Sequence, residues 1–333
     1  KTRLVWGFPY SMTVIEGLVA KPLLDWFKSH QTQMAFATTT MNLGCRLRVS
    51  AYHKRYVYSL DMSQFDSHVS RELIYKAFDV LSSWFDMDEV EPTSGLTVRE
   101  IFRIVRNYFI HTSIVMPDGR LYYGKDHGVP SGSYFTQMID SIVNVILVGA
   151  ISSSFHLNIS REDIYVLGDD ILFWSDRLVS LDHISHFASR LFHMKFNSSK
   201  SALFHRNETI HYLGRDWTKG VPSISEDEII IRMSQPETFR KYPKDDEERS
   251  RQVRMLLLSY AAVYRNAYPI YMKCLDIRPR YEHSNQSIES YVYKDHSWNV
   301  DPEFLTGLQR FRRKYEIEKT GGSIQPLALQ FWK

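Results

Sequence analysis

The chain has 333 residues, 44% hydrophobic and 14% aromatic, enough to bury a large core divided over two or three sub-domains. Its two cysteines, Cys45 and Cys274, lie far apart and form no Cys-x-x-Cys pair, which argues against a disulfide framework or a zinc site and favours a reducing compartment. The longest apolar run, 139–151, is interrupted by polar residues and too short to span a bilayer, so we expect no membrane partner. We see no signal peptide. The first residue, Lys1, begins inside a segment that reads as structured, so we expect a fragment of a longer protein.

The net charge is only +3, but its distribution is uneven. Residues 1–55 carry eight basic and two acidic residues, a net charge of +6, which leaves about −3 for the rest of the chain. A basic front end opposite an acidic centre suits phosphate binding beside a metal site. On charge alone, a solvated basic surface explains the same pattern equally well.

The first third of the chain alternates between short extended segments and helices. Residues 1–9 read as a strand that presents Lys1 and Arg3 on one face, because side chains alternate with period two. A helix is predicted over 14–27, and residues 38–44 read as a loop. A β-branched and aromatic strand over 55–60 ends in Asp61, with Asp66 five positions later.

The middle of the chain is predicted to contain helices, a hairpin and a polar loop. Helices are expected over 72–85 and 97–109, followed by a hairpin over 114–123. Gly128-Val129-Pro130-Ser131-Gly132 is a loop rich in helix breakers, and a long helix follows it. On this helix Thr136, Asp140 and Asn144 are spaced by four and share one face. That face is either a buried hydrogen-bond network or a surface turned towards a polar ligand.

Two adjacent acids occupy the tip of a predicted hairpin, Gly168-Asp169-Asp170, between apolar strands. Like charges side by side repel, and a hard divalent cation bound by carboxylate oxygens is the usual compensation. Alone, this motif is a weak signal. A helix over 181–191 and a turn carrying Lys200 come next, then a hairpin over 211–217 closed by Lys219-Gly220. A charged helix is expected over 245–267.

The motifs together, in this order, resemble the palm of viral RNA-dependent RNA polymerases over about residues 1–220. They are Asp61-x4-Asp66, Ser131-Gly132-x3-Thr136, Gly168-Asp169-Asp170, the Lys200 turn and the basic front end. The finer sequence, such as Arg3-Leu4-Val5-Trp6-Gly7 and the run from Gly128 to Gln137, is similar to the partitivirus branch of double-stranded RNA viruses.

The resemblance implies an α+β fold of the right-hand type, with a ferredoxin-like antiparallel palm sheet. The expected divisions are fingers at 1–55, palm with motif A at 56–85, a fingers insertion at 86–127, palm with motifs B to E at 128–220, and thumb at 221–333.

The resemblance also implies roles for the acids and for two groups of basic residues. Asp61 and Asp169 are the expected ligands of two Mg²⁺ or Mn²⁺ ions, with Asp170 more peripheral. Lys200 is the expected general acid towards pyrophosphate, with Lys195 as the nearby alternative. The triphosphate is expected to bind Lys1 and Arg3. The expected RNA contacts are Arg215, Arg310, Arg312 and Arg313.

Ribose selection is the remaining role that the resemblance implies, because a polar group must lie near the 2′-hydroxyl. It assigns this role to Asp66, Ser131, Thr136 and the residue at Asp140, with Gly132 shaping the loop. Many relatives carry Asn where this chain has Asp140. Two ionised carboxylates so close would repel, so we expect either that one is protonated or that an Arg or Lys side chain bridges the two.

The function expected from the resemblance is RNA synthesis on an RNA template, replicating and transcribing a viral genome. The expected partners are template and nascent RNA, NTPs and a capsid protein, and the expected location is the virion interior and host cytoplasm. One alternative is a reverse transcriptase. Another is a catalytically silent RNA-binding protein that kept the palm.

Overall fold

The computed structural model of the chain describes residues 7–116, 118–234 and 264. Four predictions therefore lie wholly or mostly outside the described residues: the strand with Lys1 and Arg3, the helix over 245–267, the basic cluster of Arg310, Arg312 and Arg313, and the thumb at 221–333. The chain divides into two compact units, residues 1–38 with 48–208, and residues 39–47 with 209–333.

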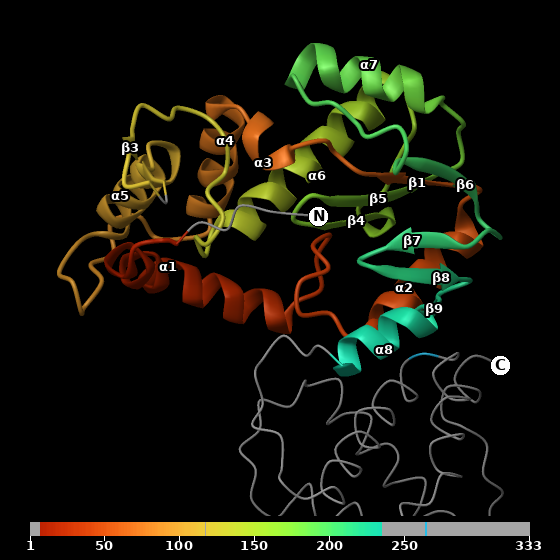
Figure 1. Ribbon diagram of the computed structural model, residues 1–333, viewed down its shortest axis with the longest axis horizontal. Coiled ribbons are helices and arrows are strands. Elements are labelled where there is room, and N and C mark those ends of the chain that lie inside the picture. Colours follow the sequence, from red (N-terminus) through yellow and green to blue (C-terminus); the bar gives the residue numbers. More distant parts are fainter. Residues whose placement is uncertain (1–6, 117, 235–263, 265–333) are drawn as a thin grey trace, which may run out of the picture. The chain divides into compact units, whose positions relative to one another are not determined.

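Figure 1 labels most of the elements, which are numbered in chain order. The helices are α1 Tyr10–Ser29, α2 Thr40–His53, α3 Phe65–His68, α4 Arg71–Ser82, α5 Val98–Ile110, α6 Thr136–Ser154, the short 3-10 helix Arg161–Asp163, α7 Leu181–Phe192 and α8 Glu226–Ser234. The strands are β1 Tyr56–Leu60, β2 Ile114–Val115, β3 Leu121–Tyr122, β4 Ile164–Leu167, β5 Asp170–Ser175, β6 Ala202–His205, β7 Ile210–Tyr212, β8 Arg215–Thr218 and β9 Val221–Ser223.

A four-stranded sheet in the order β4-β5-β1-β6 is the centre of the first unit. All its neighbouring strands are antiparallel. Helices separate β1 from β4 and β5 from β6, so the chain path is β-α-β-β-α-β, the ferredoxin-like arrangement. The predicted α+β fold with an antiparallel palm sheet is confirmed.

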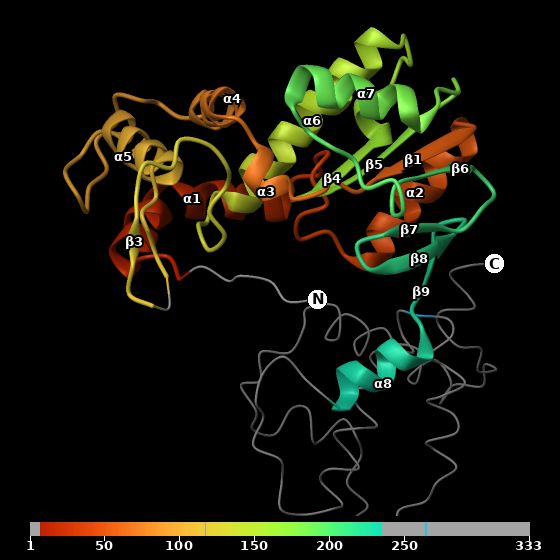
Figure 2. The same ribbon diagram turned by 45° about the horizontal axis from the view of Figure 1, so that its top comes forward.

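Residues on both faces of this sheet are buried in β1, β4 and β5. On one face Tyr58 and Phe173, which are paired across β1 and β5, stack with ring centroids 4.7 Å apart and belong to the main hydrophobic core. The core continues into α6 and α7, where Leu147 and Ile184 are fully buried. Figures 1 and 2 show α6 and α7 over the sheet, and α6 packs against β4. By length and composition α6 resembles a membrane span, but half of its apolar window is buried inside the protein, as in a core helix.

The outer edge of β4 is bonded to the segment that follows α1. The Val166 amide donates to the Gln33 carbonyl at 3.0 Å, and the Ala35 amide donates to the Val166 carbonyl at 2.8 Å. Met34 and Val166 thus form a parallel bridge. The segment satisfies backbone groups that an open sheet edge would leave unpaired.

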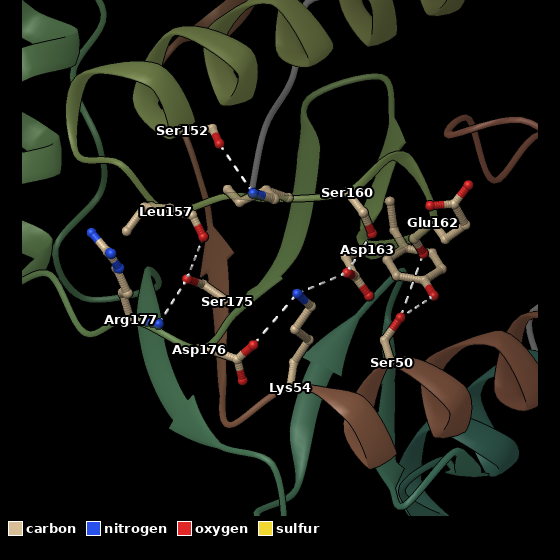
Figure 3. Close-up of polar contacts among 12 residues, drawn as sticks. Ser50, Lys54, Ser152, Leu157, Ser160, Glu162, Asp163, Ser175, Asp176 and Arg177 are labelled. Carbon is tan, nitrogen blue, oxygen red and sulfur yellow. Dashed lines mark hydrogen bonds and ion pairs between the residues drawn. The ribbon is translucent and has the colours of Figure 1, made fainter.

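A polar network fixes the ends of β4 and β5 that lie away from their connecting turn (Figure 3). Lys54 Nζ lies 3.6 Å from Asp163 Oδ2 and 3.5 Å from Asp176 Oδ2. Asp163 is buried and also accepts a 2.6 Å hydrogen bond from Ser160 Oγ. Because the charge on Asp163 is paired and hydrogen-bonded, its burial is tolerated. The network anchors the base of the β4–β5 hairpin.

The second unit contains the three-stranded sheet β7-β8-β9. Both of its turns, Leu213-Gly214 and Lys219-Gly220, have two residues with positive φ, as type I′ hairpin turns require. The predicted hairpin and its closure at Lys219-Gly220 are therefore confirmed. The aromatic residue Trp217 is buried, and its indole N–H donates to the Tyr212 carbonyl.

Most predicted helices are found within a few residues of their expected ends, and one predicted loop is wrong. The sequence of 38–44 predicts a loop, and Thr and Gly have low intrinsic helix propensity. The helix α2 instead begins at Thr40 and includes Gly44. Leu43 and Leu47, four residues apart, are both buried, so packing of an apolar stripe outweighs the low intrinsic propensity.

Candidate functional site

The three acids predicted to bind metal lie at one end of the palm sheet. Asp170 begins β5 and pairs with Leu167 across a two-residue turn. Gly168 has φ +59° while Asp169 does not have positive φ, the pattern of a type II′ turn with Gly first. Leu60 pairs with Ile171, so Asp61, one residue beyond β1, continues the register towards Asp170.

The helix α6 holds the turn that carries Asp169. Asn144 Nδ2 donates to the Gly168 carbonyl at 2.6 Å, and the Gly168 amide donates to Ser141 Oγ at 3.0 Å. Both peptide groups of the glycine are thus fixed by buried side chains from one helix. On the polar face predicted for this helix, Asn144 therefore contacts the turn that carries the acids.

Lys200 forms an ion pair with Asp61, at 3.2 Å between Nζ and Oδ2. The loop around this lysine is tied to the backbone of Asp61. The Asn197 amide donates to the Asp61 carbonyl at 2.8 Å, and Ser201 Oγ accepts from the Asp61 amide at 3.0 Å. Lys195 contributes its backbone carbonyl, which accepts from the Ser63 amide. Of the two candidate lysines, Lys200 is the one whose ammonium contacts the acidic site.

Asp140 lies in an electrostatic environment that favours its neutral form. The residue is 3% exposed, and its Oδ1 atom has no hydrogen-bond partner among the described residues. Burial, and then the negative charges of Asp66 and Asp169, raise the pKa of this carboxyl well above its usual range. A protonated Asp140 has the shape and neutrality of asparagine, so the expected repulsion between Asp66 and Asp140 is relieved.

The glycine-rich loop is bonded to the segment that carries Asp66. The Val129 amide donates to the Asp66 carbonyl at 2.6 Å, and the Gly128 amide donates to the Val69 carbonyl at 2.8 Å. Gly128 has φ +78°, and a Cβ added there would lie 2.8 Å from the Asp66 carbonyl oxygen. Only glycine allows this approach without a shift of the backbone.

The far end of the same loop leads into α6. Thr136 Oγ1 donates to the Pro130 carbonyl at 2.6 Å, which closes the loop around Ser131 and Gly132. Ser131 Oγ is buried without a hydrogen-bond partner among the described residues, as are Asp140 Oδ1 and Asn144 Oδ1. Buried polar atoms are normally satisfied, so these atoms indicate a place for a polar ligand.

One residue of this region was missed by the sequence analysis. Glu16 on α1 is fully buried and accepts hydrogen bonds from Ser133 Oγ at 2.7 Å and from the Tyr134 amide at 2.9 Å. Burial raises the pKa of its carboxyl, against the opposing effect of these two bonds. The sequence feature that could have identified Glu16 is its position as an acid on the apolar face of α1. The other buried residues of that face are Met12, Val19, Ala20, Leu23 and Phe27.

The donor set fits divalent cations of the hard type. Within residues 7–116 and 118–234, no three His, Cys, Asp or Glu side chains gather closely enough to hold a metal ion by themselves. Mg²⁺ is commonly bound by one or two carboxylates together with substrate phosphates, so a complete protein cage is not required. Asp61 and Asp169 offer carboxylate oxygens at the same end of the sheet, and Lys200 shows that this end attracts a cation.

The remaining predicted site residue in the described part is Arg215. It lies on β8 in the second unit, where its guanidinium carbon is 5.6 Å from the centre of the Tyr264 ring. Its predicted contact with RNA stays a prediction, as do the roles assigned to the residues above.

A ferredoxin-like sheet with acids beyond its first strand and at its central hairpin, and a lysine on the following loop, is the arrangement of a polymerase palm. Residues 1–267 match the sequence model of the viral RNA-dependent RNA polymerase family. The chain belongs to this family, whose members generally depend on divalent metal ions.

Similarity to individual viral polymerases supports the same family assignment. The chain is 31% identical to the RNA-directed RNA polymerase of Cryptosporidium parvum virus 1 over 150 residues, covering 44% of this chain and 26% of that protein. It is 27% identical to that of white clover cryptic virus 1 over 227 residues, covering 60% and 37%. These are double-stranded RNA viruses of the partitivirus type, so the predicted resemblance is confirmed. The chain thus spans well under half the length of these two relatives.

Among solved structures, the RNA-dependent RNA polymerase of a human picobirnavirus is similar in fold. The TM-score is 0.66 at 21% sequence identity, and the match covers 83% of this chain and 51% of that one. A mutant of the same polymerase with its insertion loop deleted gives a TM-score of 0.64, also at 21% identity, over 83% of this chain and 53% of the other. The polymerase fold is thus shown independently of close sequence similarity.

Proposed function

We propose that this chain is the catalytic core of an enzyme that copies an RNA template into RNA from NTPs, for replication and transcription of a viral genome. One observation carries the proposal: the palm sheet places Asp61 and the Asp169 turn at one end, with Lys200 ion-paired to Asp61. This occurs in a chain whose family is that of viral RNA-dependent RNA polymerases.

Asp61 and Asp169 would hold two Mg²⁺ or Mn²⁺ ions, with Asp170 at the edge of the site. Bound there, such ions activate the 3′-hydroxyl and stabilise charge on the phosphate oxygens. The hydrogen bonds of Asn144 and Ser141 to Gly168 hold the backbone of the turn that carries Asp169 in place without the metal. The protein therefore supplies a preorganised set of negative charges rather than a closed cage.

Lys200 supplies the proton in this proposal. Nucleotidyl transfer releases pyrophosphate, whose leaving oxygen needs a proton, and general acids of this kind contribute about 10²–10⁴-fold to a rate. The lysine is half exposed and lies on a loop fixed to the Asp61 backbone, so its ammonium stays beside the site while remaining accessible.

Ribose selection is assigned to Asp66 with Ser131, Thr136 and Asp140. The buried, unpartnered Ser131 Oγ and Asp140 Oδ1 provide polar atoms for a sugar hydroxyl within the described part of the chain. Thr136 uses its own hydroxyl proton on the Pro130 carbonyl, so it shapes the loop and can only accept from the ribose. Lys1 and Arg3 are proposed to hold the triphosphate.

A primer-extension assay on a homopolymer RNA template tests the function. Incorporation of NTPs that requires Mg²⁺ or Mn²⁺ and stops on chelation is the expected result. Preferential incorporation of dNTPs would instead identify a reverse transcriptase. If the full-length protein binds RNA but incorporates no nucleotide, it is the catalytically silent RNA-binding protein of the second alternative.

Replacement of Asp140 by asparagine is expected to leave activity and the preference for NTPs over dNTPs nearly unchanged, because a neutral carboxyl and a carboxamide have the same shape. Asp66→Ala is expected to lower that preference by about tenfold, the effect of losing one hydrogen bond to a charged group. The measurement is kcat/KM for a matched NTP and dNTP. Equal ratios in wild type and Asp66→Ala would contradict the assignment.

The setting of the enzyme is the last part of the proposal. We propose that it works with template and nascent RNA, in contact with a capsid protein, in the virion interior and host cytoplasm. The similarity to polymerases of double-stranded RNA viruses supports this. Sedimentation of infected-cell extracts should then place RNA synthesis in the particle fraction.

A further inference from the structure

Glu16 is a buried carboxylate that the chemistry described so far does not use. It lies on the buried stripe of α1, one turn after Met12 and one turn before Val19 and Ala20, and its side chain is 0% exposed. Burying a carboxyl group costs free energy unless its oxygens are hydrogen-bonded or ion-paired, and none of the ion pairs among the described residues includes Glu16. An apolar residue of the same length would fill this position more cheaply.

The two hydrogen bonds of Glu16 both go to the loop that precedes α6. Oε1 accepts from the Ser133 hydroxyl and Oε2 accepts from the Tyr134 amide. Ser133 Oγ in turn accepts from the Phe135 amide at 3.0 Å. The Glu16 side chain is therefore hydrogen-bonded, directly or through Ser133, to the three consecutive residues that precede α6. An added Cβ at the next residue, Gly17, would lie 3.9 Å from the Tyr134 ring, so the loop rests directly on α1.

These residues follow Ser131 and Gly132 without a break. The loop is held at its other end by Val129 on the Asp66 carbonyl, and across its middle by Thr136 on the Pro130 carbonyl. Glu16 supplies a further contact from α1, 117 residues from Ser133 in the sequence. The placement of Ser131 thus depends on a side chain far away in sequence.

We infer that Glu16 is a positioning residue that sets the nucleotide-binding conformation of the Ser131-Gly132 loop. This inference rests on the proposed function. Glu16 acts through Ser133 and Tyr134 and touches no reacting group. Loss of the Glu16 carboxyl lets the loop shift away from the ribose. The shift weakens NTP binding and lowers the selectivity for NTP over dNTP. The chemical step itself depends on Asp61 and Asp169 and is affected less.

Two substitutions at this position separate positioning from packing. Glu16→Met keeps the length of the side chain and removes both hydrogen bonds. Glu16→Gln keeps both, because its Oε1 can accept from the Tyr134 amide while its Nε2 donates to Ser133 Oγ. Asp25→Asn is the matched control, since it makes the same change from carboxylate to carboxamide at an exposed position of α1.

The experiment measures kcat and KM for a single matched NTP and dNTP in the full-length protein, together with thermal unfolding. Glu16→Met is expected to raise the KM for NTP by about tenfold and to lower NTP preference, with a smaller change in kcat. Glu16→Gln and Asp25→Asn are expected to remain within about threefold of wild type.

Two results would overturn the inference. One is Glu16→Met with unchanged KM and NTP preference. The other is an equal loss in Glu16→Met and Glu16→Gln that follows their thermal unfolding, which would make Glu16 a packing residue. Failure of the proposed function is a different result, because the wild-type protein would then incorporate no NTP at all.

Discussion

Asp169→Ala is expected to abolish NTP incorporation while leaving RNA binding largely intact. The acid lies at the tip of a turn that is fixed by its own backbone and by α6, so its removal does not disturb the fold. It removes a carboxylate that the metal ions need. Loss of one negative charge also leaves attraction to RNA phosphates unchanged or slightly stronger. Primer extension and a filter-binding assay on the same preparation measure the two properties.

Asp182→Ala is the control for this substitution. It makes the same change of charge at an exposed position of α7, and it is expected to retain full activity. Incorporation that persists in Asp169→Ala would reject the assignment of the catalytic acids. A simultaneous loss of RNA binding would show instead that the residue supports the fold or the RNA surface.

Gly128→Ala is expected to destabilise the protein and to impair nucleotide selection together. The glycine has φ +78°, which costs a residue with Cβ about 1–2 kcal/mol. The new Cβ would also meet the Asp66 carbonyl at 2.8 Å, so the backbone of Asp66 has to move. This carbonyl accepts from Val129, which makes the loop and Asp66 shift as one. Thermal unfolding and the NTP/dNTP ratio report the two effects.

Gly124→Ala separates the clash from the backbone strain. Gly124 has φ +88°, similar to that of Gly128, but a Cβ added there would meet no atom of another segment within 4 Å among the described residues. It is expected to show only the strain, and therefore a smaller fall in stability than Gly128→Ala. Equal stability of the two variants would show that the contact with the Asp66 backbone is unimportant.

Several elements of the fold could be predicted from the sequence because their signals are local. The strand before Asp61, the Gly168-Asp169 turn and the capping box of α5 each act within a few residues. In that box Thr97 and Glu100 exchange hydrogen bonds at the predicted helix start. Type I′ and II′ turns likewise depend on two residues with a restricted backbone. Such elements do not need the rest of the fold to be recognised.

The parts that were missed depend on contacts between distant segments. Thr40 to Gly44 has low helix propensity, and only the packing of Leu43 and Leu47 makes it helical. Glu16 lies 117 residues from Ser133, so nothing near it in the chain reveals its partner. Lys200 was named from the resemblance, with Lys195 as the alternative, but its ion pair with Asp61 likewise depends on where a distant loop meets that acid. No spacing rule contains this information.

The segment paired with β4 has a consequence for the behaviour of the protein at high concentration. A bare strand edge is a template for pairing with another chain, and repeated pairing leads to aggregates. The hydrogen bonds of Gln33 and Ala35 to Val166 occupy that edge with the chain's own backbone. A replacement that breaks this short pairing, such as proline at Ala35, should therefore appear first as a loss of solubility.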